Sequence, residues 1–275
     1  MKILDRALIV LFNFCLLLVT IILSAVCVAG SENFYHRQFE KTGVYAQIEN
    51  GAEYRLKIHY VNGGDYTDWA TFSDEQLDKI VEHIISYLFT DQESFKLVMD
   101  DVAYKGVKTD GVSVFGDISV GHMVDVKELF QFFIGFAWGL GISLLAIIGY
   151  FIWRRKEVKK LFLKYTLIFY GIFVGLIGIF CGWALIDVLR NDWGMENYTR
   201  VLWANFHHLI FPFQADKFAG SFFADPLTEI LTLDLFMGAV VTVLIVVAIV
   251  LLAWFVFSFC CWFFERKNSK KSDAV

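Results

Sequence analysis

One stretch of the sequence, GHMVDVKELFQFFIGFAWGLGISLLAIIGYFIWRRKEVKK (residues 121–160), decides the fold. It opens with a histidine and an aspartate three residues apart, His122 and Asp125, and becomes almost uniformly apolar from Leu129 to Trp153. An apolar run of about 20 residues is long enough to cross a bilayer as a helix. A basic segment, residues 154–160, follows the apolar run. The stretch therefore predicts a membrane helix with polar residues at its amino-terminal end and positive charge at its carboxyl-terminal end.

The composition of the whole chain agrees with a membrane protein. Of its 275 residues, 57% are hydrophobic, 29 are Phe and only 2 are Pro. Its mean hydropathy is +0.56, and soluble domains contain fewer apolar residues, typically about 45–50%. The 5 cysteines show neither a C-x-x-C motif nor a zinc-like spacing, so the sequence indicates no disulfide framework and no zinc knuckle.

Four apolar runs are long enough to span a membrane. We expect these spans at residues 7–30, 129–153, 165–188 and 235–264. The first follows Arg6 and resembles a signal peptide, but its apolar core is longer than the roughly 7–15 residues of a signal peptide. We therefore interpret it as a retained helix.

Lysine and arginine predict the orientation of these spans. They are concentrated at the amino terminus, in the loop 154–164 and in the tail 265–275, which all lie on one side of the membrane in a four-span chain. The positive-inside rule makes that side cytoplasmic. We expect a multi-pass membrane protein with both termini in the cytoplasm and with residues 31–128 and 189–234 facing outward. Because the outer segment 31–128 is acidic, a nucleic-acid partner is not expected.

Residues 31–128 have the pattern of a small mixed α/β domain. Ser73-Asp74-Glu75-Gln76 is a capping box before an amphipathic helix that ends near Phe89. Residues 54–60 alternate with a period of two and lead into the turn signal Asn62-Gly63-Gly64-Asp65, and we expect further strands at 95–103 and 112–115. The predicted fold is an α-helical membrane protein whose four transmembrane helices are capped by a small, strand-containing extracytoplasmic domain.

Small residues recur on one face of two predicted spans. The third span carries glycines at helical spacing, namely Gly171, Gly175, Gly178 and Gly182, and the second carries Gly135 and Gly139. Because small residues let helix backbones approach closely in lipid, we expect these two spans to pack tightly.

Polar residues that can carry chemistry gather in the predicted outer segments. His122 and Asp125 share a helix face because they are three residues apart, and either Asp117 or Ser119 can cap this helix. The outer loop 189–234 contains the pair His207-His208 and also Asp225. An imidazole titrates near neutral pH and can accept a proton there, whereas we expect structural roles for the other histidines, His36, His59 and His83.

The residues alone leave three readings open. The histidines can be anchors at the membrane interface, in which case the protein is a non-catalytic, membrane-tethered sensor or ligand-binding protein. Alternatively, His122, His207 and His208 can ligate zinc with an acid, as in a metal-dependent membrane hydrolase, although no H-E-x-x-H motif is present. In the third reading, His122 and the pair His207-His208 act as a general acid and base.

Several motifs together resemble one family, the lipoprotein intramolecular transacylase (Lit) family of integral membrane proteins. The specific motif is His122-Met123-Val124-Asp125-Val126-Lys127 at the entrance to the second span. It is supported by Ser86-Tyr87-Leu88, by Phe206-His207-His208-Leu209-Ile210-Phe211 and by Phe223-Ala224-Asp225-Pro226. The chain departs from the family at Ser119, where members commonly carry a glutamate.

The resemblance implies an acyltransferase with no cofactor and no metal. Its substrate would be a lipoprotein whose N-terminal cysteine carries a diacylglyceryl thioether, and its reaction would move the sn-2 acyl chain onto the free α-amino group, giving the lyso-form. The resemblance places His122 and His207 at the catalytic centre, with Asp125, His208 and Asp225 in supporting roles. The implied partners are this lipoprotein and membrane lipid.

Overall fold

The computed structural model describes residues 3–42, 55–60, 67–104, 107–190, 201, 204–205, 227 and 230–272. The chain divides into two compact units. The first contains Met1–Ala25, Phe133–Tyr198 and Thr242–Val275, and the second contains Val26–Phe132 and Thr199–Val241.

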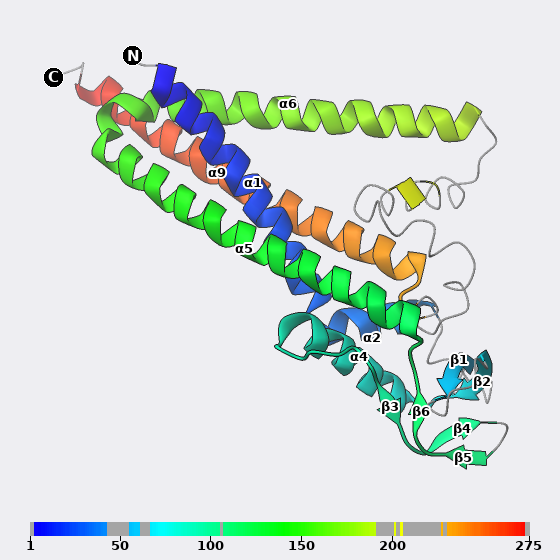
Figure 1. The fold of residues 1–275 in the computed structure, drawn as a ribbon. Helices are drawn as coiled ribbons and strands as arrows, with labels where there is room; N and C mark the ends of the chain where they lie inside the picture. The colour runs from blue at the N-terminus through cyan, green and yellow to red at the C-terminus, as the bar shows by residue number, and fades with distance from the viewer. Residues whose placement is uncertain are drawn as a thin grey trace. The chain divides into compact units, whose positions relative to one another are not determined.

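Long helices dominate the chain (Figure 1), and four of the described ones are apolar enough to cross a membrane. They are α1 (Ile3–Ala29), α5 (Asp117–Trp153), α6 (Arg155–Arg190) and α9 (Leu233–Ser272). The four predicted spans fall in these helices, one in each. The helix α5 begins at Asp117, well before the predicted span at Leu129, because the polar turns that carry His122 continue the same helix. A single residue, Arg154, separates α5 from α6.

The helix α1 is the most buried of the four within the first unit. Of its most apolar window, 39% is buried, against 11%, 11% and 6% for the windows of the other spans. Phe12 of α1 contacts aromatic rings of three other helices, with centroids 6.0 Å from Phe151, 5.6 Å from Phe162 and 5.8 Å from Trp254. This aromatic cluster therefore joins all four helices.

Buried polar contacts also hold α1 to its neighbours. Asp5 is fully buried, and its Oδ1 accepts a 2.7 Å hydrogen bond from the Tyr150 hydroxyl while Arg154 Nη2 lies 3.8 Å from its Oδ2. Asn13, also fully buried, donates from Nδ2 to the Ile9 carbonyl and to Thr166 Oγ1, at 2.7 Å and 3.1 Å. Asp5 fixes α1 against α5 near the turn that joins α5 to α6, and Asn13 fixes α1 against α6 further from that turn.

The expected packing of glycine faces is not observed among the described residues. A Cβ added at Gly171, Gly175, Gly178 or Gly182 would meet no atom within 4 Å, and the same holds for Gly135 and Gly139. The prediction that these faces join the second and third spans is therefore wrong. Small residues permit a close approach of helices, but aromatic and polar contacts of α1 determine the packing here.

The second unit contains a six-stranded antiparallel sheet. Its strand order is β3-β6-β1-β2-β4-β5, and the strands are β1 (Arg55–Tyr60), β2 (Thr67–Thr71), β3 (Val98–Met99), β4 (Val102–Tyr104), β5 (Val107–Thr109) and β6 (Val112–Ser113). The predicted strand at 54–60 is confirmed as β1. The strand expected at 95–103 is instead divided in two, because the chain turns at Asp101, whose φ is 56°, a left-handed conformation that aspartate tolerates.

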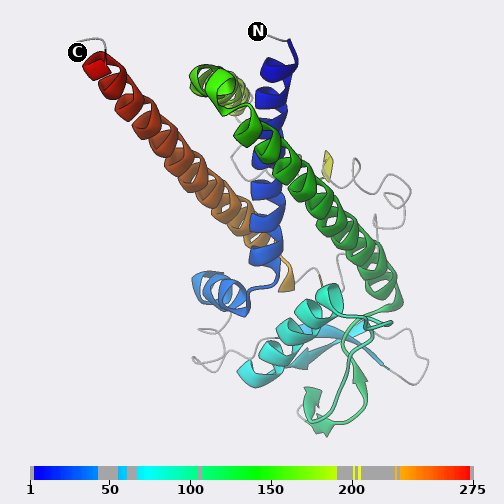
Figure 2. The same cartoon turned by 90° about the vertical axis from the view of Figure 1, so that its left-hand side faces the viewer.

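The helix α4 (Asp74–Phe89) lies beside this sheet (Figure 2) and confirms the predicted capping box. Ser73 Oγ accepts from the Gln76 backbone N–H, and the Gln76 side chain accepts from the Ser73 N–H. The apolar face of α4 is buried with strand residues, with α2 (Glu32–Thr42) and with the ends of α5 and α9 in one core. Gly238 lets α9 approach α2 closely, since a Cβ there would come within 2.7 Å of Gln38.

Candidate active site

The first turns of α5 hold His122 in a buried position. The exposed fraction of His122 is 7%, and those of Ser119 and Met123 are 0% and 2%. These residues share one helix face, which packs against the core of the second unit, whereas Val124 on another face is 41% exposed. Asp117 is the first residue of α5 and Ser119 lies inside its first turn, so neither of the two predicted capping residues precedes the helix.

Asp125 follows one turn later on α5, as its spacing from His122 predicts. Its side chain is half-buried, and its Oδ2 atom is enclosed without a hydrogen bond to the described part of the chain. Asp125 and Glu128 also act on Tyr87 of α4. Burial raises the pKa of the Tyr87 hydroxyl, and the negative charges of these two carboxylates raise it further. Two carboxylates of α5 therefore act electrostatically on Tyr87 of α4.

Two other histidines have structural roles, in agreement with the sequence. His83 Nε2 lies 3.0 Å from the Phe95 carbonyl oxygen, and its ring is 5.3 Å from that of Phe95 and 6.5 Å from that of Phe115. Burial lowers the pKa of His83, and its hydrogen bond to the Phe95 carbonyl offsets part of this effect. His36 Nδ1 lies 3.4 Å from Asp78 Oδ1 and links α2 to α4. His59 is in β1.

The predicted partners of His122 lie outside the described residues. His207, His208 and Asp225 all fall in the part of the chain that the structure does not describe, as does the expected turn at 62–65. Their approach to His122 remains a prediction from the sequence.

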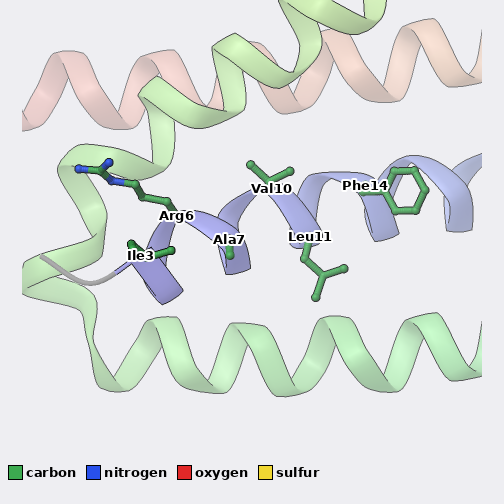
Figure 3. A pocket seen from close by; sticks show the side chains of 6 residues that line it. All are labelled: Ile3, Arg6, Ala7, Val10, Leu11 and Phe14. Carbon is green, nitrogen blue, oxygen red and sulfur yellow. The ribbon is translucent and has the colours of Figure 1, made fainter.

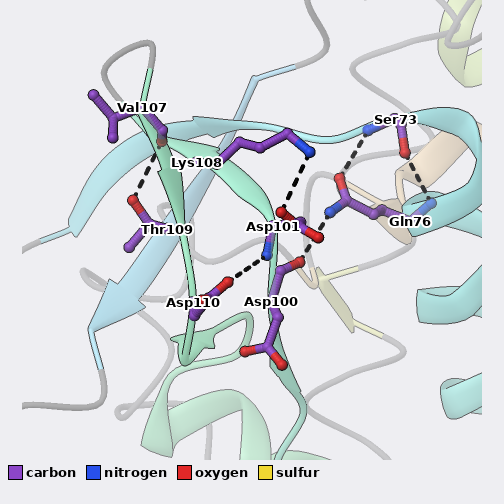
Figure 4. A network of polar contacts seen from close by, with 8 residues as sticks. All are labelled: Ser73, Gln76, Asp100, Asp101, Val107, Lys108, Thr109 and Asp110. Atoms are coloured by element: carbon purple, nitrogen blue, oxygen red, sulfur yellow. Dashed lines mark hydrogen bonds and ion pairs between the residues drawn. The ribbon is translucent and has the colours of Figure 1, made fainter.

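Within the ranges that the structure describes, no group of three or more His, Cys, Asp or Glu residues is placed to hold a metal ion. The acidic residues near β4 and β5 form polar contacts with the protein itself, and part of this network is drawn in Figure 4. Asp100 Oδ1 accepts from the Gly111 N–H, and Asp110 Oδ1 accepts from the Asp101 N–H. Lys108 Nζ lies 3.3 Å from Asp101 Oδ1. This cluster stabilises a hairpin.

A shallow groove on α1 has no carboxylate, imidazole or thiol among the lining residues that the structure describes. These are Ile3, Arg6, Ala7, Val10, Leu11 and Phe14 (Figure 3). Arg6 carries the charge of this set, and the Arg6 guanidinium lies 5.9 Å from the centre of the Tyr165 ring. A groove of this kind on a membrane helix is suited to lipid contact, and His122 lies in the other unit.

The sequence assigns no role to Tyr87 or to Lys127, although they belong to the motifs Ser86-Tyr87-Leu88 and His122-Met123-Val124-Asp125-Val126-Lys127. Tyr87 is 1% exposed, and Lys127 Nζ lies 4.6 Å from the centre of the Tyr87 ring. Their contact joins α4 to α5 across a long separation in sequence, so no local pattern reveals it.

Comparisons with solved structures identify the fold. The chain is similar to the membrane-integral lipoprotein intramolecular transacylase Lit from Bacillus cereus, with a TM-score of 0.58 and 16% identity over 99% of both chains. Two variants of that enzyme, in which one histidine is replaced by alanine or by arginine, match with the same TM-score and identity. They cover 99% and 98% of this chain and 96% and 94% of theirs. No curated protein sequence matches the chain.

The family is shown by sequence. The family model described as lipoprotein intramolecular transacylase Lit matches residues 10–236, which include the first turns of α5 and the segment with His207. A match of this extent, on a chain with four candidate membrane helices and a small sheet, agrees with the resemblance drawn from the motifs. The chain therefore belongs to the Lit family of lipoprotein intramolecular transacylases and is a transferase.

Proposed function

We propose that this protein moves the sn-2 acyl chain of a diacylglyceryl-cysteine lipoprotein onto the α-amino group of the same cysteine, with His122 and His207 as acid and base. The observation that supports this most is the placement of His122. It is buried in the first turns of α5, a helix that continues directly into a candidate membrane span. A base at that position can meet a substrate whose acyl chains are in lipid and whose peptide is in water.

The chemistry of the substrate explains the need for a histidine. An α-amino group has a pKa of about 7.7–8.0, so much of it is protonated and unreactive at neutral pH. An imidazole accepts its proton, and the free amine attacks the carbonyl carbon of the sn-2 ester. The C–N bond forms as the ester C–O bond breaks, and the proton passes to the departing oxygen, which becomes the sn-2 hydroxyl.

The reaction requires no nucleophile from the protein. Because the amine and the ester belong to one molecule, holding them together can contribute about 7–11 kcal/mol to lowering the barrier. A group that donates to the developing oxyanion adds to this. We assign the roles of base and of acid or oxyanion donor to His122 and His207. His208 is the alternative candidate for the role of His207, and Asp125 and Asp225 are supporting carboxylates.

The site is proposed to face outward from the bacterial plasma membrane. The positive-inside rule places the basic loop 154–164 and both termini in the cytoplasm. The contact between Asp5 and Arg154 supports a shared side, because it brings the start of α1 to the turn between α5 and α6. His122 lies at the opposite end of α5 from that turn.

Mass spectrometry of N-terminal lipopeptides tests the proposal. In a bacterial host that lacks lipoprotein N-acylation, the native protein is expected to produce the lyso-form, and His122→Ala or His207→Ala is expected to abolish it. His36→Gln is the matched control, because His36 contacts Asp78 within the second unit and has no proposed chemistry. Lyso-form at the native level in both alanine variants would contradict the assignment of the histidines.

Treatment with a chelator tests the alternative that the protein is a metal-dependent membrane hydrolase. We expect purified protein to retain its activity after treatment with EDTA, since the proposed reaction uses two imidazoles. Loss of activity with EDTA and its recovery with zinc would favour the metal-dependent reading.

A further inference from the structure

The segment between α4 and β3, residues 90–97, is fastened to α5 on both sides of His122. Lys96 Nζ lies 3.7 Å from Oδ1 of Asp117, the first residue of α5. Lys127 Nζ donates a 2.7 Å hydrogen bond to the Gln92 carbonyl. Asp117 and Lys127 stand five residues before and five residues after His122. The helical turns that carry the proposed base therefore lie between two contacts with one segment.

These two contacts differ in strength. The Lys96 and Asp117 side chains are 64% and 95% exposed, and such an exposed ion pair stabilises a protein little. Lys127 is half-buried and has two fixed partners, the Gln92 carbonyl and the face of the Tyr87 ring at 4.6 Å. A charged donor strengthens a hydrogen bond, and a partly desolvated ammonium over an aromatic face adds a further attraction.

Tyr87, the aromatic partner of Lys127, is itself held rigidly. Tyr87 is 1% exposed, and its ring centroid is 5.1 Å from that of Phe95. Phe95 stacks on Phe115 at 4.5 Å, and Phe115 lies two residues before the start of α5. Lys127 thus connects the third turn of α5 to the same aromatic core that fixes its beginning.

From this arrangement, and resting on the proposed function, we infer that Lys127 is a positioning residue for the transacylation. It holds the turns of α5 that carry His122 at a fixed distance from α4 and from segment 90–97, and it does not touch the reacting atoms. The reaction depends on placing an amine, an ester and a base together, and a misplacement of about 1 Å can lower such a rate by about 100-fold.

Steady-state kinetics with a synthetic diacylglyceryl-cysteine lipopeptide in detergent micelles test this inference. We expect Lys127→Met to lower kcat about tenfold and to change KM less than about twofold, because positioning acts on the chemical step. Lys127→Arg is expected to restore most of kcat, since a guanidinium donates to a carbonyl and stacks on a tyrosine ring. Lys96→Met is the matched control and is expected to keep the native kcat.

A second pair of variants tests whether Lys127 positions α5 through its contact with the Tyr87 ring. Tyr87→Phe keeps the ring and is expected to retain activity, whereas Tyr87→Leu removes it and is expected to lower kcat as Lys127→Met does. The double variant Tyr87→Leu/Lys127→Met should be no slower than the slower single variant, because both remove one contact. If Lys127→Met does not fold, Lys127→Gln replaces it, since glutamine can still reach a carbonyl but carries no charge.

Separate results overturn the inference and the proposed function. Native kcat in Lys127→Met, with His122→Ala inactive, overturns the positioning role and leaves the proposed function standing. A rise in KM alone, or no recovery with Lys127→Arg, also overturns it, because the lysine would then contact substrate or have another task. Activity retained in His122→Ala overturns the catalytic assignment and the inference that rests on it.

Discussion

The Asp5 carboxylate accepts a 2.7 Å hydrogen bond from the Tyr150 hydroxyl, and this contact joins the first turn of α1 to the far end of α5. The same carboxylate lies 3.8 Å from the Arg154 guanidinium. A fully buried aspartate in this position is stable only with such partners, because an ionised carboxylate without them loses its solvation.

Replacing Asp5 should destabilise the helix bundle. Removing one partner of a buried ion pair costs about 3–5 kcal/mol, and we expect a loss near the lower end of that range because the Arg154 side chain is 23% exposed. Thermal unfolding in detergent measures the effect of Asp5→Ala. Asp5→Asn, which can still accept from Tyr150, should lose less, and equal losses in the two variants would contradict this explanation.

The contact between Asn13 and Thr166 should be measurable as a coupling energy. Polar contacts between membrane helices contribute about 0.6 kcal/mol on average, and Asn13 Nδ2 is 3.1 Å from Thr166 Oγ1. A double-mutant cycle with Asn13→Ala and Thr166→Val, followed by unfolding in mixed micelles, is expected to give a coupling of about this size. Strictly additive losses would show that the contact does not join α1 to α6.

The second unit should lose stability as the pH falls below about 6.5. Burial lowers the pKa of His83 in the folded protein from its ordinary value of 6.5. The unfolded chain therefore binds a proton at a higher pH than the folded protein, and stability decreases as the pH drops from 6.5 towards the folded pKa. Melting curves between pH 7.5 and pH 5.0 should show a smaller decrease for His83→Gln. An equal decrease in both proteins would assign the effect to other groups.

The capping box of α4 should contribute about 1 kcal/mol. Ser73→Ala removes the acceptor of the Gln76 N–H, and Gln76 also donates from its side chain to the Asp100 carbonyl at 3.3 Å. Glu75→Ala is the control, because Glu75 pairs with the exposed Lys79 among the described residues and its loss should change stability by less than about 0.5 kcal/mol. Chemical denaturation monitored by far-UV circular dichroism distinguishes the two variants.

Local sequence patterns predicted the main elements of the fold. Apolar runs located all four membrane helices, the Ser73 box located the start of α4, and alternation located β1. The errors occurred where tertiary structure overrides local pattern. Asp101 takes a positive φ that interrupts the strand expected at 95–103. A Cβ added at the glycines of α5 and α6 that were expected to pack would meet no atom within 4 Å in the described part of the chain.

Of the predicted site residues, the structure describes His122 and Asp125, whereas His207, His208 and Asp225 lie outside the described residues. The spacing of His122 and Asp125 predicted a shared helix face, and the structure places His122 on a buried one. The roles of Tyr87 and Lys127 could not be predicted, because their contact joins residues 40 positions apart, and only the packing of α4 against α5 brings them together.

The single residue between α5 and α6 has a consequence for biogenesis. With only Arg154 between them, we expect the two helices to enter the bilayer together as a helical hairpin. The helix α1 is synthesised long before that hairpin. Asp5 therefore has neither its hydrogen-bond partner Tyr150 nor its ion-pair partner Arg154 until more than half of the chain has been translated. Insertion of the hairpin then provides these two partners, and α9, which is synthesised last, follows.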